Sequence, residues 1–411
     1  MSLNAKPDVE TRHAPFPLKI LAESSLLRSR ISRWPGVQFP FPPKQLPTFP
    51  VGWNVEYAVQ PNVTTPGGYA TGIAVDATGA IHLVYWDCAL GSLLYSVKNG
   101  GSWSAPVIID TVNLAGQKGG YFHLSMALDS SGNVHVCYGN YLNGDLKHSW
   151  KANNAWNVEV VQPGTGYNEI DETAVLVDPN GVIHVLYNVW VQAKSAYILK
   201  YVAKTGASWC NPTDVDPQST YGGSPAIVID SKGTIHAVYV TTSQLKSAVK
   251  APNDVWKPSH VIDTFGNYMA IMWTSIAVDP SDAIHLSYFD VENKCIKYAT
   301  KNANTAWIPS TILFANLDFG MSSIAANAAG NVGLAFYNSA DRTLEFMWKT
   351  KGSWDAAQVV DSTVDSGAYC HLAMDSKGSP HISYFRTVGA NELSFGVTSV
   401  LHAYQSAIRH S

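Results

Sequence analysis

Charged side chains are scarce in this sequence, and long apolar runs are missing. Aspartate, glutamate, lysine and arginine together make up 14% of the 411 residues, and the formal net charge is −4. This balance gives no attraction to a polyanion, and no basic stripe is interleaved with aromatic residues, so we expect no nucleic-acid partner. No apolar run approaches the ~20 residues that span a bilayer, so the sequence predicts a soluble protein without a membrane span.

Cysteine supplies no structural framework either. The five cysteines show no paired spacing of the metal-binding or redox type, and their odd number fits poorly with a set of disulfides. The residues up to Trp34 also lack the charged, apolar and small segments of a secretory signal. We therefore expect either a cytoplasmic protein or one that is exported without a classical signal peptide.

The chain does contain an internal repeat. Seven tryptophans recur at intervals of 47 to 53 residues, and they are Trp53, Trp103, Trp156, Trp209, Trp256, Trp307 and Trp354. A second segment, Asp-x-x-Gly-x-Ile-His-x-x-Tyr, keeps step with them from residues 76–85 to residues 375–384. Strand-like segments such as Leu199-Lys200-Tyr201 follow it. Each period therefore holds about four short strands separated by turns.

Repeats of roughly 40 to 50 residues with four strands are typical of β-propeller blades, because one small sheet cannot bury both of its faces without neighbours. The sequence predicts an all-β fold, a seven-bladed β-propeller of four-stranded blades over residues 52–396. The last period lacks a tryptophan strand, whereas the strand around Trp53 precedes any complete period. We expect this N-terminal strand to complete the last blade, which closes the ring and hides its sheet edges.

Two terminal segments fall outside the repeat. Residues 1–51 combine a basic, amphipathic stretch with a proline-rich one, which favours an extended or disordered chain. They are interpreted either as a strap on the outside of the ring or as a docking or export segment that meets a protein partner. Residues 397–411 are predicted to form a C-terminal tail.

The repeated histidines are interpreted as structural residues. Side chains that recur in every blade occupy equivalent positions around a ring, so they cannot converge on one ion. Each is expected to satisfy local hydrogen bonds, and the set comprises His82, His135, His184, His236, His285 and His381. The repeated tryptophans are expected to pack between blades.

Function is expected where the repeat is broken, along the strands that line the central channel. At one aligned position six blades carry a small residue, whereas the seventh carries His371. Two residues earlier, where strand alternation predicts the same facing, the blades carry Ala70, His123, Glu172, Ser224, Trp273, Met321 and Tyr369. We predict that His123, His371, Tyr369 and Glu172 form a catalytic set at the channel mouth, with Trp273 as a stacking surface for the ligand.

The loops between second and third strands are predicted to add a polar, ligand-binding rim. Its candidate residues lie five positions after the repeated histidine or its counterpart, and they are Asp87, Asn140, Asp290, Asn338 and Arg386. A guanidinium near a channel mouth is suited to gripping a carboxylate, phosphate or sulfate through two parallel hydrogen bonds. The alternative for Arg386 is a structural ion pair.

Two classes of function remain open at this point. Histidine or tyrosine can move a proton, and tryptophan can stack on a sugar ring, so one asymmetric site predicts a lyase or a Glu172-dependent hydrolase acting on a polar carbohydrate. The alternative is a non-catalytic propeller, either lectin-like, a protein-interaction platform or a secreted effector component addressed by residues 1–51. If two or more of His123, Glu172 and His371 converge, they could hold a divalent metal, so the cofactor is expected to be either none or such a metal.

The repeated units over residues 69–396 resemble those of seven-bladed propellers grouped with sialidase-like repeat proteins, ulvan lyases and lectins. The resemblance implies the propeller fold and, for the lyases, chemistry by His, Tyr and Arg. Two features depart from sialidases. The chain lacks Ser-x-Asp-x-Gly-x-x-Trp boxes, and the propeller has only Arg342 and Arg386 where sialidases use three arginines. The resemblance therefore does not extend to sialidase activity.

Overall fold

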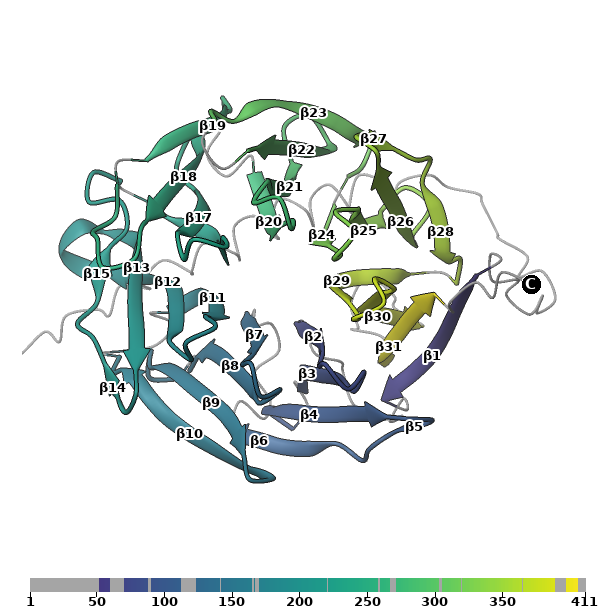
Figure 1. Ribbon diagram of the computed structural model, residues 1–411, viewed down its shortest axis with the longest axis horizontal. Coiled ribbons are helices and arrows are strands. Elements are labelled where there is room, and N and C mark those ends of the chain that lie inside the picture. Colours follow the sequence, from purple (N-terminus) through teal and green to yellow (C-terminus); the bar gives the residue numbers. More distant parts are fainter. Residues whose placement is uncertain are drawn as a thin grey trace, which may run out of the picture. The chain divides into compact units, whose positions relative to one another are not determined.

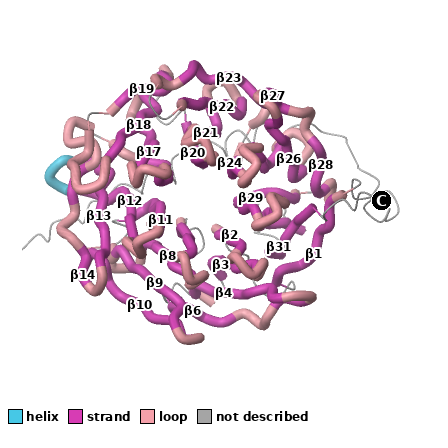
Figure 2. The backbone as a smooth tube through the Cα atoms, in the orientation of Figure 1, coloured by secondary structure: helices cyan, strands magenta, loops and turns pink. Residues whose placement is uncertain are grey.

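The computed structural model is built almost wholly from β-strands (Figure 2). It describes residues 52–59, 70–87, 90–111, 123–140, 142–164, 166, 170–219, 221–257, 259–266, 271–302, 305–318, 320–363, 365–388 and 397–405. Over these ranges the one helical segment is a short 3-10 turn, η1 (Gln192–Lys194), and no helix is long and apolar enough to span a membrane. The predicted roles of residues 1–51 lie outside the described residues.

The strands form seven sheets, and each sheet is one blade. The first strands are β2 (Thr71–Val75), β7 (Leu124–Leu128), β11 (Ile170–Val177), β16 (Gly223–Ile229), β20 (Ile271–Val278), β24 (Ser322–Ala326) and β29 (Ser366–Met374). The second strands are β3 (Ile81–Asp87), β8 (Val134–Gly139), β12 (Ile183–Val191), β17 (Ile235–Val240), β21 (Ile284–Asp290), β25 (Val332–Asn338) and β30 (Pro380–Val388). The third strands are β4 (Ser92–Asn99), β9 (Leu146–Ala152), β13 (Ala196–Thr205), β18 (Gln244–Lys250), β22 (Cys295–Lys301), β26 (Thr343–Thr350) and β31 (Val397–Gln405).

The outer strands carry the repeated tryptophans or follow them. Four blades have a continuous outer strand, namely β10 (Ala155–Gln162), β19 (His260–Thr264), β23 (Ile308–Ala315) and β1 (Trp53–Val59). In the other three the outer strand is split into β5 (Ser102–Trp103) and β6 (Val107–Thr111), β14 (Ser208–Trp209) and β15 (Thr213–Asp214), and β27 (Ser353–Trp354) and β28 (Gln358–Asp361). We number the blades 1 to 7 from the one that begins with β2.

Neighbouring blades meet along their first strands. β2 contacts β7, β7 contacts β11, and the series continues through β16, β20 and β24 to β29, which contacts β2 again. Figure 1 shows first strands around the central opening and outer strands at the rim. The predicted seven-bladed propeller is therefore confirmed.

Blade 7 is completed by the first strand of the chain. Its sheet has the order β1-β31-β30-β29, and Trp53 pairs with Gln405 in antiparallel register. This arrangement confirms the predicted closure of the ring. One boundary changes, because the sequence predicts a tail from residue 397, whereas residues 397–405 form the third strand of blade 7. Without β31 there would be no strand between β30 and β1.

The Asp-x-x-Gly-x-Ile-His segment forms the turn between first and second strands. In blade 1, Oδ1 of Asp76 accepts hydrogen bonds from two backbone N–H groups of the turn, each at 2.9 Å, and Gly79 has a φ of +86°, which suits glycine. His82 lies with Nε2 3.3 Å from Asp76 and Nδ1 2.8 Å from the hydroxyl of Tyr95. All six repeated histidines are buried, and burial lowers their pKa values. Their predicted structural role is confirmed by these contacts.

Four of the repeated tyrosines tie a blade to the blade before it. The hydroxyl of Tyr138 in blade 2 donates to Asp110 of blade 1 at 2.8 Å, and Lys147 donates to the same carboxylate at 2.8 Å. The same hydroxyl–carboxylate bond joins Tyr239 to Asp216, Tyr288 to Asp263 and Tyr384 to Asp361. These bonds satisfy buried polar groups that would otherwise destabilise the blade contacts.

Two blade contacts carry a longer polar chain built on a glutamate. Glu56 of β1 accepts hydrogen bonds from His402 at 2.9 Å, Lys98 at 2.5 Å and Trp103 at 2.9 Å. Glu159 of β10 accepts the same three bonds from His148, Lys204 and Trp209. Each of these histidines also bonds and stacks on a repeated histidine, His381 or His135. Both glutamates end the tetrapeptide Trp-Asn-Val-Glu, which occurs twice in the sequence.

We expect Glu56→Gln to lower the free energy of unfolding at pH 7 by about 2 to 3 kcal/mol, because three donors lose a charged acceptor. Burial would raise the pKa of Glu56, but the bonds from His402, Lys98 and Trp103 lower it from 4.5 to about 2. A carboxyl with a depressed folded-state pKa stabilises the fold fully above its unfolded pKa and loses that effect as the pH falls through the folded value. Urea unfolding of Glu56→Gln should therefore show a weaker pH dependence between about 4.5 and 2.

The matched control is Glu159→Gln, which removes the same bonds from a contact that does not join the chain ends. It should give a similar loss of stability and a similar change in pH dependence. Unfolding curves that coincide with the unmodified protein at every pH would contradict the assignment of these glutamates as acceptors.

Candidate functional site at the channel mouth

Two of the six small residues predicted to face the channel link neighbouring blades through a backbone hydrogen bond. Oγ of Ser275 accepts a hydrogen bond from the backbone N–H of Ile324 in the next blade at 3.0 Å. Oγ of Ser323 accepts in the same way from the N–H of Leu372 at 3.0 Å. A small side chain therefore suits this position for two reasons, because it leaves the channel open and its hydroxyl reaches the neighbouring strand.

His371 is the exception at this position. Its side chain is exposed to the channel, and it forms no hydrogen bond or ion pair with any other residue that the structure describes. The protein nevertheless encloses the channel around it. This enclosure, together with an electrostatic interaction with His123, lowers the pKa of His371 to about 4. His371 is therefore a neutral imidazole at pH 7, close enough to His123 for the two rings to interact electrostatically.

The position two residues earlier does not follow simple strand alternation. The register between first and second strands shifts at this point in four blades, between Ile170 and Thr173, Gly223 and Ala226, Met272 and Ser275, and Ala368 and His371. Three of the residues in these bulges have a left-handed backbone, with φ of +45° at Ser224, +51° at Trp273 and +53° at Tyr369. Such values are rare for bulky residues, so the surrounding structure must hold them in place.

The bulges create a chain of bonds between blades. The backbone N–H of Ser224 donates to the carboxylate of Glu172 in the preceding blade. The N–H of Trp273 donates to Oγ of Ser224 at 3.1 Å, and the N–H of Tyr369 lies 2.8 Å from the sulfur of Met321. A side chain at this ring position thus accepts a bond from the equivalent residue of the next blade. The need for such an acceptor accounts for some of the different residue types that the seven blades have at this position.

Glu172 is held on two sides by these contacts. Its own N–H donates to Oδ1 of Asn188 at 2.6 Å, and Nδ2 of Asn188 lies 3.5 Å from its carboxylate. Ser224 bonds the same carboxylate from blade 4. The side chain is half-buried, so the carboxylate is engaged in joining blades 3 and 4.

The two aromatic candidates lie against buried rings. The ring of Tyr369 packs edge-on against Phe385, with centroids 6.1 Å apart. The indole of Trp273 lies 6.2 Å from Phe289. Both side chains are half-buried, so each keeps one part accessible and one part in the packing between strands.

Arg386 is placed as a structural residue. Its side chain is buried, its guanidinium bonds to Asp361, and its Nε donates to Ser366 at 3.0 Å. In blade 7 the third strand carries Leu401 at the position where blades 2 to 5 place a lysine beside the repeated tyrosine. Arg386 therefore supplies the cation that Asp361 would otherwise lack, and a ligand anion would have to compete with that carboxylate.

The polar residues of the predicted rim cap their own loops. Asp87 and Asn140 accept hydrogen bonds from backbone N–H groups two or three residues further on. Asp290 is buried and accepts bonds from Asn293 and Lys297. Asn338 is buried as well, and its amide donates to carboxylates of its own blade. Such side-chain bonds are typical of turns.

Over the residues that the structure describes, no group of three or more His, Cys, Asp and Glu side chains is arranged to hold a metal ion. His123 and His371 interact across the channel, whereas Glu172 is engaged with Ser224 and Asn188. The two imidazoles are thus linked by an electrostatic interaction, whereas the carboxylate bonds to the neighbouring blade.

The comparisons with known proteins show the fold. No protein-family model and no curated protein matches the sequence. Solved structures do: an ulvan lyase of polysaccharide lyase family PL25 aligns with a TM-score of 0.58 at 12% identity, over 84% of this chain and 94% of that chain. AofleA from Arthrobotrys oligospora aligns with a TM-score of 0.51 at 13% identity, over 76% and 90%. A mutant of the NanB sialidase from Streptococcus pneumoniae aligns with a TM-score of 0.52 at 11% identity, over 92% and 72%.

The resemblance that the repeats predict to sialidase-like and ulvan-lyase propellers is confirmed at the level of the fold. Identities of 11 to 13% carry no residue of those proteins onto this chain. What the site does must therefore be argued from its own side chains.

We expect His123→Ala to raise the pKa of His371, because it removes one of the two causes that lower it from 6.5 to about 4. The enclosure of the channel remains, so the value should rise only part of the way. Titration of the His371 imidazole by NMR measures the shift. An unchanged pKa would contradict the placement of both rings in one channel, and Ser125→Ala at the same ring is a control that should leave the value as it is.

Proposed function

We propose that this protein binds a polar carbohydrate at the mouth of its central channel, in one asymmetric site centred on His371 and His123. The observation that carries the proposal is the exposed imidazole of His371 at a ring position where the other six blades have glycine, alanine or serine. A neutral imidazole both donates and accepts hydrogen bonds, as a sugar hydroxyl does. The related folds include a lyase and a sialidase, which supports carbohydrate as the ligand class.

A second candidate function is catalysis of an elimination, with His371 as the general base. It is favoured by the exposed position of His371, and the lowered pKa keeps its imidazole unprotonated over most of the pH range, although it also makes the imidazole a weaker base than an ordinary histidine. His371 would take the proton from the carbon next to a uronate carboxylate. The electrons of that C–H bond would form a new C=C bond while the neighbouring C–O bond breaks, and the leaving oxygen would take a proton from Tyr369, His123 or water.

Binding without turnover is the alternative that the remaining contacts favour. An elimination needs a cation to neutralise the substrate carboxylate, and Arg386 is paired with Asp361. A hydrolase would need a free carboxyl, and Glu172 is bonded to Ser224. Binding is therefore the function that these contacts favour. Proton abstraction would need a substrate that His123 and His371 can bind without Arg386 or Glu172.

We expect His371→Ala and His123→Ala each to lower the affinity for the ligand at least about tenfold while costing less than about 1 kcal/mol of stability. His371 makes no bond to the described residues that folding would miss. Calorimetric titration with uronate-containing and neutral oligosaccharides measures the affinity. The ultraviolet absorbance of an unsaturated product reports elimination, and its rate should fall as the pH drops through about 4.

His285→Ala is the matched control. It removes a repeated histidine that bonds Tyr298 at 2.7 Å and Asp279 at 3.2 Å, so we expect a loss of about 2 to 3 kcal/mol in stability with ligand affinity retained. Equal affinity of all three variants, or a loss of stability in His371→Ala as large as in His285→Ala, would overturn the proposed site.

A further inference from the structure

One position between the blades is filled by a ring in every blade but one. It lies on the third strand of each blade. The residue that pairs with the repeated histidine, or with the residue that replaces this histidine in one blade, comes two positions later. Six blades place there Tyr95, His148, Tyr201, Tyr298, Phe346 and His402, whereas blade 4 places Ser247. The missing ring leaves space between blade 4 and blade 5.

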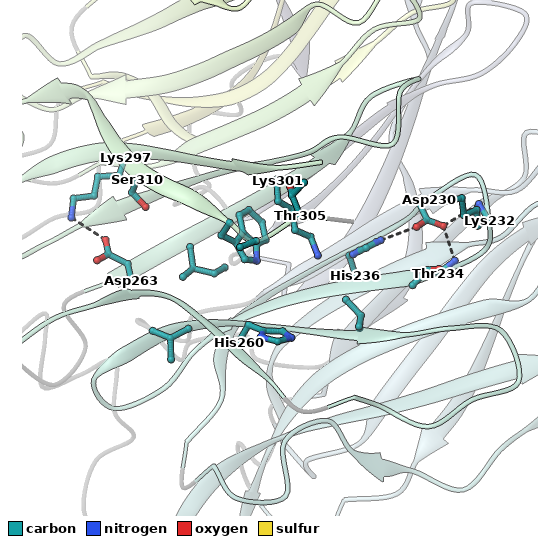
Figure 3. A pocket seen from close by; sticks show the side chains of 15 residues that line it. Asp230, Lys232, Thr234, His236, His260, Asp263, Lys297, Lys301, Thr305 and Ser310 are labelled. Carbon is teal, nitrogen blue, oxygen red and sulfur yellow. Dashed lines mark hydrogen bonds and ion pairs between the residues drawn. The ribbon is translucent and has the colours of Figure 1, made fainter. Parts of the chain in front are cut away.

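This space is a cavity of about 840 Å³. Figure 3 shows it between the two blades, with the bonded pair His236 and Asp230 at one end and Lys301 and Thr305 from blade 5 beside it. The cavity is lined by the outer and third strands of its blades, by His236 of the second strand β17 and by the turn that precedes β17, and none of the residues that line it lies on a first strand around the channel. Its volume is within the range of small-molecule sites.

His236, which lines the cavity, has a buried ring nitrogen without a hydrogen-bond partner among the described residues. In five blades Nδ1 of the repeated histidine bonds to the tyrosine hydroxyl or imidazole at the ring position, as in His82 with Tyr95 at 2.8 Å. Nδ1 of His236 is buried and has no partner among the described residues. Its Nε2 lies 3.0 Å from the carboxylate of Asp230, which can only accept, so Nδ1 of the neutral ring is the acceptor. A hydroxyl donor is therefore missing at this point.

The cavity also contains a buried cation without an ion pair. In two blade contacts the lysine equivalent to Lys301 bonds a glutamate, Lys98 to Glu56 and Lys204 to Glu159. In the other two contacts each glutamate pairs with the residue at the ring position of its blade. In blade 4 the residue that pairs with Ser247 is His260, so a histidine replaces the glutamate. Lys301 is 8% exposed and has no ion pair to a described residue.

Where the ring position holds a tyrosine, the buried lysine ammonium contacts the phenol ring and not a carboxylate. There the lysine ammonium lies over the phenol, as Lys151 does over Tyr95 at 4.7 Å from the ring centroid. Lys301 instead lies 5.5 Å from its own Trp307, and the indole N–H of Trp307 donates to Ser247 at 2.8 Å. Burial lowers the pKa of Lys301, which Asp230 partly offsets. Blade 4 thus lacks the ring, the hydroxyl and the carboxylate that other contacts supply.

We propose that this cavity binds a small ring-bearing hydroxy acid, whose hydroxyl donates to Nδ1 of His236 and whose carboxylate meets Lys301, with His260 on the blade 4 side. The ligand takes the places that a tyrosine or histidine ring and a glutamate fill elsewhere in the same molecule. Two sources have this chemistry, a sugar acid and an aromatic hydroxy acid. The proposal does not rest on the channel site, because none of its residues lines the channel.

The test is calorimetric titration of the full chain with D-glucuronate and with 4-hydroxybenzoate. D-glucose and inorganic phosphate are matched probes, because one lacks the carboxylate and the other lacks the ring. We expect one of the two acids to bind with a stoichiometry of one, at least about tenfold more tightly than either matched probe. Which acid binds identifies the source.

Ser247→Tyr restores the arrangement of blades 1, 3 and 5. The new hydroxyl should bond Nδ1 of His236, and the ring should fill the cavity under Lys301. The lost bond to Trp307 is tolerable, because the equivalent indole N–H groups of Trp156, Trp256 and Trp354 are also unpaired among the described residues. We expect this variant to melt at a higher temperature and to lose binding of the acid.

Lys301→Met keeps the apolar stem and removes the charge, so it should weaken binding at least about tenfold. Lys250→Met, at the equivalent lysine between blades 3 and 4, and His371→Ala in the channel should leave binding unchanged. The proposal is overturned if neither acid binds at about 10 mM, if phosphate or glucose binds as well as the acids, or if a folded Ser247→Tyr or Lys301→Met binds like the unmodified protein.

Discussion

The need to satisfy the polar groups that are buried between blades is the constraint on which this propeller depends, and at four contacts a tyrosine hydroxyl meets it by donating to a carboxylate of the blade before it. A four-stranded sheet has two apolar faces, and only its neighbours can cover them. Covering them also buries polar groups, which must find partners in the next blade. Tyr138 with Asp110 and Lys147 shows the usual solution. Arg386 with Asp361 and Tyr384 shows how blade 7 reaches the same solution after losing its lysine.

The sequence predicts the architecture well, because the ring imposes one residue pattern on every blade. The tryptophan period and the displaced strand around Trp53 are enough to predict seven blades and their closure. The prediction of a tail at residue 397 fails because β31 carries Leu401 instead of a lysine and so lacks the Leu-Lys-Tyr signal. The twice-used Trp-Asn-Val-Glu segment was the available signal for the glutamate contacts at Glu56 and Glu159.

The candidate site was harder to predict, because strand alternation breaks down at the bulges. Glu172 and Tyr369 were expected to face the channel, yet their surroundings are set by bonds to the adjacent blades. A bulge depends on which backbone N–H finds an acceptor across the ring, and a linear sequence does not show that pairing. His371 needed no such information, because a large residue among six small ones stands out in the aligned repeats. The same reasoning finds Ser247, a small residue among six rings.

Closure by β1 and β31 has a consequence for how the molecule is made. Glu56 and His402 are bonded although 346 residues separate them. During synthesis the first strand leaves the ribosome with an unpaired edge and keeps it until nearly the whole propeller has followed. Pairings of such long range form slowly, and an exposed edge is open to pairing with other chains. The edge of β1 is therefore exposed to pairing with other chains until β31 has been made.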